Sequence, residues 1–177
     1  MQLKVKKCHN SGERCVAAES AMKNSSWVAL LVALLFSSVL YAKTPLAKIT
    51  ITADGKRPIE ITDPNTVSYF HVWSGPGTSS NETQSFIIDW THRCGAPPAT
   101  LQRYHVRFYG KDDRLIYTVD YVVEPSLRRG CVYLPGKSDD AYPANASAIL
   151  RGVEGNWFRA WPAWDKVAIP AIVKGSQ

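Results

Sequence analysis

Two alternating segments on either side of one short polar turn constrain the fold more than any other feature of the sequence. Residues 103–109 and 114–123 alternate apolar and polar side chains, and the four residues 110–113 between them include a glycine and two aspartates. Alternation with a period of two is typical of strands that bury one face. The pattern therefore predicts two antiparallel strands joined by a four-residue loop.

The loop also sets an expected register for this hairpin. We pair Tyr109 with Arg114, the residues that border the loop. This register sets Arg103 opposite Asp120 on the solvent-facing side, where His105 also lies and where we expect an Arg103–Asp120 ion pair. The other side must then be the buried one, and it holds Tyr104, Val106, Phe108, Leu115, Tyr117 and Val119.

Shorter alternating segments predict the rest of a sheet. Residues 48–52 and 57–62 flank an Asp-Gly turn and read as a hairpin with four isoleucines inward: Ile49, Ile51, Ile59 and Ile61. Further strands are expected at 85–90, 129–134 and 155–160. Runs of strands with helices at their ends predict an α+β single domain, mainly an antiparallel sheet of about five to seven strands with two or three helices.

Proline positions indicate where the helices begin. Asp63 followed by Pro64 is typical of a helix start, and apolar spacing extends that helix about ten residues, to Trp73. Pro162 fits the first turn of a second helix, which we expect to run through Ile169 and end near Pro170. Residues 139–150 stay ambiguous, because alanines favour a helix while a proline limits where it can start.

An uncharged apolar run near the N-terminus predicts a leader. Residues 27–42 carry no charge, follow Lys23 and end in alanine, as a secretory signal cleaved after Ala42 would. The run is shorter than the roughly 20 residues of a membrane-spanning helix, although an uncleaved anchor stays an alternative. The ordinary layout of a signal peptide begins at Met22, so we expect residues 1–42 to comprise a mis-started stretch 1–21 and a signal peptide 22–42.

Removal of the leader changes which functions the composition allows. The domain at 43–177 would have 135 of the 177 residues and a formal charge of +3, since five basic and two acidic residues precede it. A charge that small does not predict a nucleic-acid partner. We expect a secreted or periplasmic protein with an unknown protein or small ligand as its partner, and membrane contact only through an uncleaved leader.

Two cysteines remain after the leader, and we expect them to be bonded. Cys94 and Cys131 lie in no Cys-x-x-Cys or nucleophile motif. In an exported protein a lone pair is more often bridged than free. A structural disulfide is therefore expected, and it would stabilise the fold by about 3–4 kcal/mol in the chain-entropy model.

The chain lacks the common motifs of catalysis. His71, His92 and His105 have no zinc-binding spacing, and no glycine-flanked serine or phosphate-binding loop occurs. We therefore expect no metal and no cofactor. Five tryptophans follow residue 43, and core packing is expected of them rather than sugar stacking. Asn81 and Asn145 begin N-glycosylation sequons, which matter only in a glycosylating host.

A set of short motifs is similar to small bacterial exported proteins of uncharacterised function. The motifs are EITDP at 60–64, VWSGPG at 72–77, DW at 89–90, VYLPG at 132–136 and RGVEGNWF at 151–158. The resemblance covers about residues 47–170. It implies a bacterial, extracytoplasmic origin and one autonomous domain, but no catalytic residue.

Two functions of different classes are compatible with these features. The first is a non-enzymatic extracytoplasmic module that binds through a sheet face or the loop 74–84; the best candidate binding residues are Glu154, Asn156 and Trp157, in a glycine-flanked turn. A tight structural turn would explain the same three residues. The second is a small secreted hydrolase that uses an acid–histidine pair, Asp89 and His92. We prefer the module, and we assign no catalytic residue.

Overall fold

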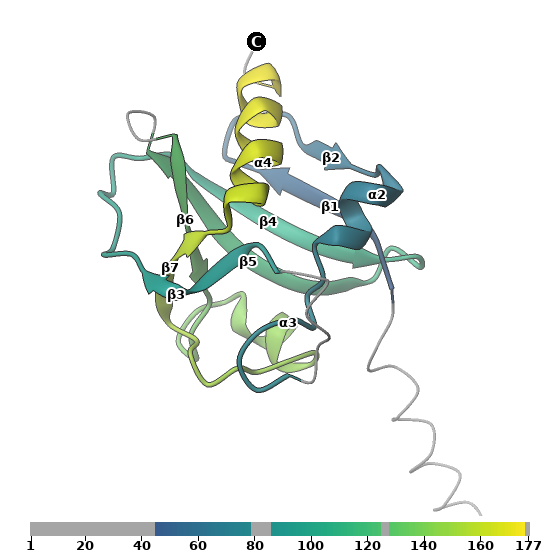
Figure 1. Cartoon of the computed structure of the whole chain (residues 1–177), viewed down its shortest axis with the longest axis vertical. Coiled ribbons are helices and arrows are strands. Elements are labelled where there is room, and N and C mark those ends of the chain that lie inside the picture. The colour runs from purple at the N-terminus through teal and green to yellow at the C-terminus, as the bar shows by residue number, and fades with distance from the viewer. Residues whose placement is uncertain (1–44, 79–85, 125–127, 176–177) are drawn as a thin grey trace, which may run out of the picture. The chain divides into compact units, whose positions relative to one another are not determined.

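The computed structural model describes residues 45–78, 86–124 and 128–175. These residues form an α+β domain in which seven antiparallel strands make one sheet (Figure 1). The expected fold class is confirmed. The elements, in chain order, are β1 (Leu46–Thr52), β2 (Ile59–Ile61), α2 (Pro64–Tyr69), β3 (Ile88–Arg93), β4 (Arg103–Gly110), β5 (Leu115–Glu124), β6 (Arg129–Leu134), α3 (Tyr142–Ala146), β7 (Asn156–Ala160) and α4 (Pro162–Gly175).

The strand order in the sheet is β2-β1-β4-β5-β6-β7-β3, so β2 and β3 are its edges. The β4–β5 hairpin lies at the centre, as its strong alternation suggests. β1 pairs with β4 on one side of the hairpin, and β6 pairs with β5 on the other. β3 lies at the opposite edge, beside β7, although β4, β5 and β6 separate these two strands in the sequence.

The expected register of the β4–β5 hairpin is wrong by two residues. His105, not Arg103, lies opposite Asp120, because an irregularity between Phe108 and Tyr109 displaces the pairing next to the loop. A shift of two residues leaves the side chains of 103–108 and 117–122 on their expected faces. Arg103 therefore still reaches Asp120 diagonally, with 3.3 Å between Nη1 and Oδ2, and the expected ion pair exists. The irregularity near the loop, however, places Leu115 opposite Tyr109 and buries Ile116, so the expected burial of Leu115 is wrong.

The first hairpin is confirmed. Ile49 pairs with Ile61 and Ile51 with Ile59, and all four share the core-facing side, where the two β1 residues are fully buried. The strand expected at 85–90 is shifted to Ile88–Arg93, whereas β6 has the expected bounds.

Helix α2 begins where the sequence indicates but ends early. The Asp63 carboxylate accepts a hydrogen bond from the Thr66 backbone at 2.8 Å, as an N-cap does. The helix ends at Tyr69 rather than at Trp73. After Tyr69 the chain buries Phe70, Val72 and Ser74, alternate residues that one face of a continuing helix could not bury together.

Helix α4 starts at Pro162 as expected but continues through Pro170 to Gly175. Interior proline removes one helical hydrogen bond and costs about 3 kcal/mol. Trp164, Ala168 and Ile172 recur every four residues along this helix and are all buried. Because this apolar stripe extends past the proline, its burial outweighs the lost hydrogen bond, and ending the helix at Ile169 was a wrong prediction.

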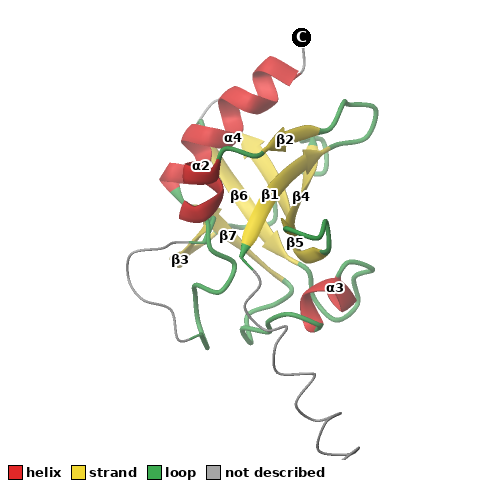
Figure 2. Cartoon of the chain, turned by 90° about the vertical axis from the view of Figure 1, so that its right-hand side faces the viewer, coloured by secondary structure: helices red, strands yellow, loops and turns green. Residues whose placement is uncertain are grey.

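The core lies between one face of the sheet and the helices α2 and α4. The rings of Phe70, at the end of α2, and Trp164 of α4 meet edge to face, with their centroids 5.2 Å apart. Figures 1 and 2 show α3 at the other end of the sheet, beside β5. Among the described residues, no helix is long and apolar enough to cross a membrane.

Helix α3 supplies an amide that extends the central sheet. The pairing of β5 with β6 ends at Asp120 and Tyr133, and the chain after β6 reaches Pro135, which has no N–H to donate. The side-chain amide of Asn145 instead exchanges two hydrogen bonds with the backbone of Thr118, at 2.7 and 2.8 Å. Asn145 is fully buried, so its sequon has a structural role in the folded domain; Asn81 lies outside the described residues.

Candidate functional site

A cavity of about 570 Å³ lies where β6 begins, β7 ends and the first half of α4 passes over them. Four cationic side chains line it: Arg128, Arg129, Arg159 and Lys166. Three belong to separate elements, because Arg129 starts β6, Arg159 lies in β7 and Lys166 lies in α4. Antiparallel pairing of β6 with β7 brings the two arginine-bearing strand segments side by side. We call this cavity the cationic cleft.

The four cations have carboxylates nearby but pair directly with none of the described ones: the sheet places Arg129 opposite Glu124 and Arg159 opposite Asp89, and the charge of Arg129 acts on Asp165. None of their side chains makes a hydrogen bond or an ion pair within the described part of the chain. Arg128, Arg129 and Lys166 are exposed, and Arg159 is half-buried. Arg128 also has φ of 48°, in the left-handed region that residues other than glycine rarely adopt. The cleft therefore presents positive charge to solvent.

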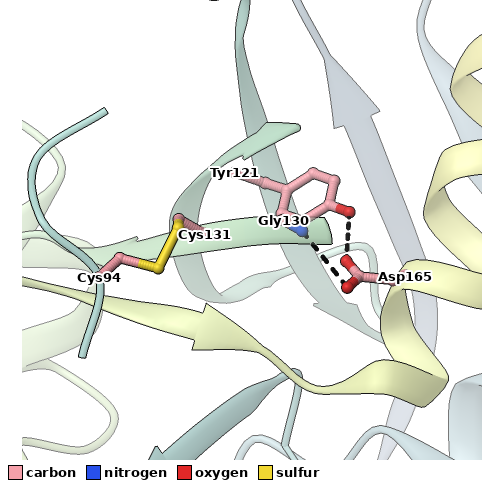
Figure 3. Close-up of a disulfide and its surroundings, with 5 residues drawn as sticks. All are labelled: Cys94, Tyr121, Gly130, Cys131 and Asp165. Atoms are coloured by element: carbon pink, nitrogen blue, oxygen red, sulfur yellow. Dashed lines mark hydrogen bonds between the residues drawn. A yellow bond between two sulfur atoms is a disulfide. The ribbon is translucent and has the colours of Figure 1, made fainter. Parts of the chain in front are cut away.

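Two carboxylates line the same cleft, but both are engaged elsewhere. Asp165 accepts hydrogen bonds from the Tyr121 hydroxyl at 2.6 Å and from the Gly130 backbone at 3.3 Å (Figure 3). Burial raises the pKa of the Asp165 carboxyl, against these two hydrogen bonds and the charge of Arg129, which lower it. Asp165 thus joins α4 to β5 and β6 and does not pair directly with a cleft cation.

Asp89 is the second carboxylate of the cleft, and Thr91 and His92 hold it. Its Oδ1 accepts from the Thr91 hydroxyl at 2.6 Å, and its Oδ2 lies 2.7 Å from His92 Nδ1. Burial alone would raise the pKa of Asp89, but the hydrogen bonds from Thr91 and His92 outweigh it and lower that pKa. Asp89 therefore stays ionised and is already paired on its own strand.

A second cavity of about 400 Å³ adjoins the cationic cleft through shared residues. Arg129 and Arg159 line both cavities. The outer wall of the second cavity is the segment that starts at Cys94 and continues through Pro97 and Pro98. The confirmed Cys94–Cys131 disulfide ties this wall to β6, as Figure 3 shows. We call this second cavity the disulfide cavity.

The candidate binding residues predicted from the sequence lie in a different place. Glu154 accepts from the Arg151 backbone, and the Asn156 amide donates to the carbonyls of Val153 and Glu154, at 3.1 and 3.2 Å. These bonds hold a turn between α3 and β7. Trp157 lies on the outer face of the sheet, where its ring stands 5.1 Å from that of Tyr133. None of the three lines either cavity described above.

Arg151, at the start of the RGVEGNWF motif, is buried in an aromatic cage. Only 5% of its surface is exposed, and its guanidinium carbon lies 4.7–5.3 Å from the ring centroids of Phe86, Trp90 and Tyr117. Burial lowers the pKa of this guanidinium. Its Nη2 donates to the carbonyls of Val72 and Ser74, within the VWSGPG motif. The RGVEGNWF, VWSGPG and DW motifs thus meet at the buried side chain of Arg151.

The described histidines fall into separate surroundings. His92 contacts Asp89 but does not line the cleft, and 57% of its side chain is exposed. His105 lies 2.7 Å from Asp120, on the outer face of the sheet next to Arg103. His71 follows α2, away from both of these pairs along the chain. Within the described residues, no group of three or more His, Cys, Asp or Glu side chains is placed to hold a metal ion.

Sequence reasoning missed the four cations of the cleft. A basic pair at 128–129 was the one local signal, but it precedes a strand and resembles an ordinary charged turn. Arg159 alternates with apolar neighbours and Lys166 lies on an exposed helix position, so neither stands out. Their convergence depends on the pairing of β6 with β7, which the sequence does not show.

Searches against protein-family models, curated proteins and solved structures find no match to the chain. The motif resemblance to small bacterial exported proteins therefore stays a prediction.

Proposed function

We propose that this chain is an exported, non-enzymatic binding domain that holds an anionic ligand in the cationic cleft. The observation that carries the proposal is the combination of four cations that make no hydrogen bond or ion pair with the described residues and two lining carboxylates that are hydrogen-bonded elsewhere. Three of the four cations are arginines, whose planar guanidinium groups match carboxylate or phosphate oxygens in pairs. The proposed localisation is secreted or periplasmic, which is supported by the apolar leader and by a disulfide of the kind that oxidising compartments favour.

The hydrolase alternative has one supporting observation, the 2.7 Å contact between Asp89 and His92. A hydrolase also needs that pair to face a concave site where substrate can bind. His92 lies outside the lining of both cavities, so the binding function is the better supported of the two. Hydrolysis of a simple ester that is lost in His92→Ala but kept in Arg159→Gln would reverse this preference.

The binding proposal is tested by calorimetric titration of the protein with citrate, a small tricarboxylate. We expect binding that weakens as the salt concentration rises from about 50 to 200 mM, because exposed charges are increasingly screened. Arg159→Gln should weaken citrate binding by about tenfold, since a charge-assisted hydrogen bond contributes roughly 1.5 kcal/mol or more.

Arg57→Gln is the matched control. Arg57 is exposed in the turn between β1 and β2 and lines neither cavity. The same charge is removed in both variants, so equal losses in the two would show an effect of net charge alone. That result, or unchanged binding in Arg159→Gln, would contradict the assignment of the cleft.

A further inference from the structure

We infer that the ligand of the cleft is an acidic, partly apolar segment of a protein partner, bound in extended form across both cavities. This inference rests on the proposed anion-binding function and specifies its ligand. It starts from the two residues that the cavities share, Arg129 and Arg159. Arg159 pairs across the sheet with Cys131, two positions after Arg129, so the two arginines stand on adjacent strands. A ligand that contacts both arginines has access to both cavities.

The cavities are larger than a single carboxylate or phosphate requires. Their volumes, about 570 and 400 Å³, each fall in the range of roughly 300–1,000 Å³ that is typical of sites for much larger molecules. Cations outnumber carboxylates in both of them: Lys166 lies at the α4 side of the first, and the second holds three arginines, Arg93 included, against one carboxylate, Glu124. A chain with several negative groups complements this arrangement better than one compact anion does.

The uncharged part of the lining selects among the classes of polyanion. Pro162, Ile169 and Pro170 line the cationic cleft, and Pro97, Pro98 and Leu101 line the disulfide cavity. None of the described lining residues is aromatic, so the site lacks the stacking platform on which proteins hold single-stranded nucleic acid. Polyphosphate carries no apolar groups that these residues could bury. A peptide that alternates acidic and apolar side chains offers both kinds of contact.

The test uses fluorescence anisotropy with synthetic peptides blocked at both ends. The reference peptide alternates glutamate and leucine over eight residues, which is about 26 Å when extended. Its controls replace every glutamate with glutamine, replace every leucine with serine, or halve its length. We expect each control to bind at least about tenfold more weakly than the reference, because each removes the charge, the apolar contacts or the second cavity.

Variants of the protein test which cavity binds which part of the peptide. Lys166→Gln alters only the cationic cleft and Leu101→Ser only the disulfide cavity, and each should weaken binding of the eight-residue peptide. For the four-residue peptide, we expect Lys166→Gln to weaken binding and Leu101→Ser to leave it unchanged. Arg57→Gln should affect neither peptide. Circular dichroism and thermal unfolding of each variant establish that it is folded.

Failure of this inference can be told apart from failure of the proposed function. If citrate binds but the long peptide binds no more tightly than the short one, the extended peptide is ruled out while the anion site stands. Tighter binding of polyphosphate, or of vesicles rich in phosphatidylglycerol, than of the acidic peptide would likewise overturn the inference. If neither citrate nor any peptide binds, the proposed function itself is wrong.

Discussion

Arg151 shows how one charged side chain can determine the course of distant backbone segments. Its guanidinium contacts three aromatic rings from the part of the chain between 86 and 117, and it donates to two carbonyls that follow α2. Its Nε and Nη1 have no hydrogen-bond partner among the described residues. The side chain is therefore held by ring contacts and two carbonyls rather than by a carboxylate.

Replacement of Arg151 by alanine should lower the free energy of unfolding by about 3 kcal/mol. It removes the guanidinium from the aromatic cage and leaves the carbonyls of Val72 and Ser74 without this donor. Arg151→Lys should recover only part of the loss, because an ammonium group lacks the planar shape that stacks on rings. Urea unfolding of the three proteins measures both effects. Full recovery by lysine would show that charge alone matters.

At this scale, sequence reasoning succeeds where the signal is local. The Asp63–Thr66 cap and the Cys94–Cys131 bond involve residue types with few other uses in such positions, and both are present. The cage around Arg151 was not predicted, because a charged residue in a glycine-flanked turn is ordinarily exposed. Nothing in the neighbouring sequence indicates that three rings from elsewhere will surround it.

The elements were predicted better in kind than in extent or pairing. Each expected strand has a counterpart in the sheet, but α2 ends early and α4 continues through Pro170, since in both cases tertiary contacts outweigh local preference. The place of β3 beside β7 joins residues about 70 positions apart. Pairing over such a distance leaves no periodic signal in the sequence, so the strand order, and the cleft that depends on it, could not be predicted.

The disulfide joins Cys94, the residue after β3, to Cys131, the third residue of β6, across 37 positions of sequence. A Cys94→Ser, Cys131→Ser double variant should lose about 3–4 kcal/mol of unfolding free energy, since the bond restricts the unfolded chain over this loop. Guanidinium unfolding measures the change. Reduction of the unaltered protein is the control and should give the same loss. A loss below about 1 kcal/mol would show that strain in the folded state offsets the restriction.

For the molecule as a whole, the buried and hydrogen-bonded carboxyl groups act in opposite directions on acid stability. Hydrogen bonds from Thr66 lower the pKa of Asp63, and those from Thr91 and His92 lower that of Asp89 against the effect of burial. Such groups stabilise the fold above their unfolded pKa values, and this contribution is lost as the pH falls through their folded values. Asp165 is the reverse case, because burial raises its pKa.

Comparison of the protein with an Asp165→Asn variant isolates the contribution of Asp165. The folded state holds a proton on Asp165 at pH values where the unfolded chain has released it. The free energy of unfolding, relative to the variant, should therefore be highest below the unfolded pKa and should fall as the pH rises through the raised folded pKa. Unfolding titrations from about pH 3 to pH 7 measure this slope. Asp89→Asn is the control and should show the opposite slope, since the pKa of Asp89 is lowered.

The two ends of the strand order bear on whether copies of this domain would aggregate. An open sheet exposes unpaired backbone groups along its outer strands, and such edges can recruit strands from other molecules. β2 is only three residues long and leads into Asp63 and Pro64, while β3 has a register break after Asp89 and ends in three exposed residues. Short length, irregular pairing and a nearby proline are the devices that make an edge a poor template. The domain can therefore keep an open seven-stranded sheet at high concentration without offering a long, regular strand for self-association.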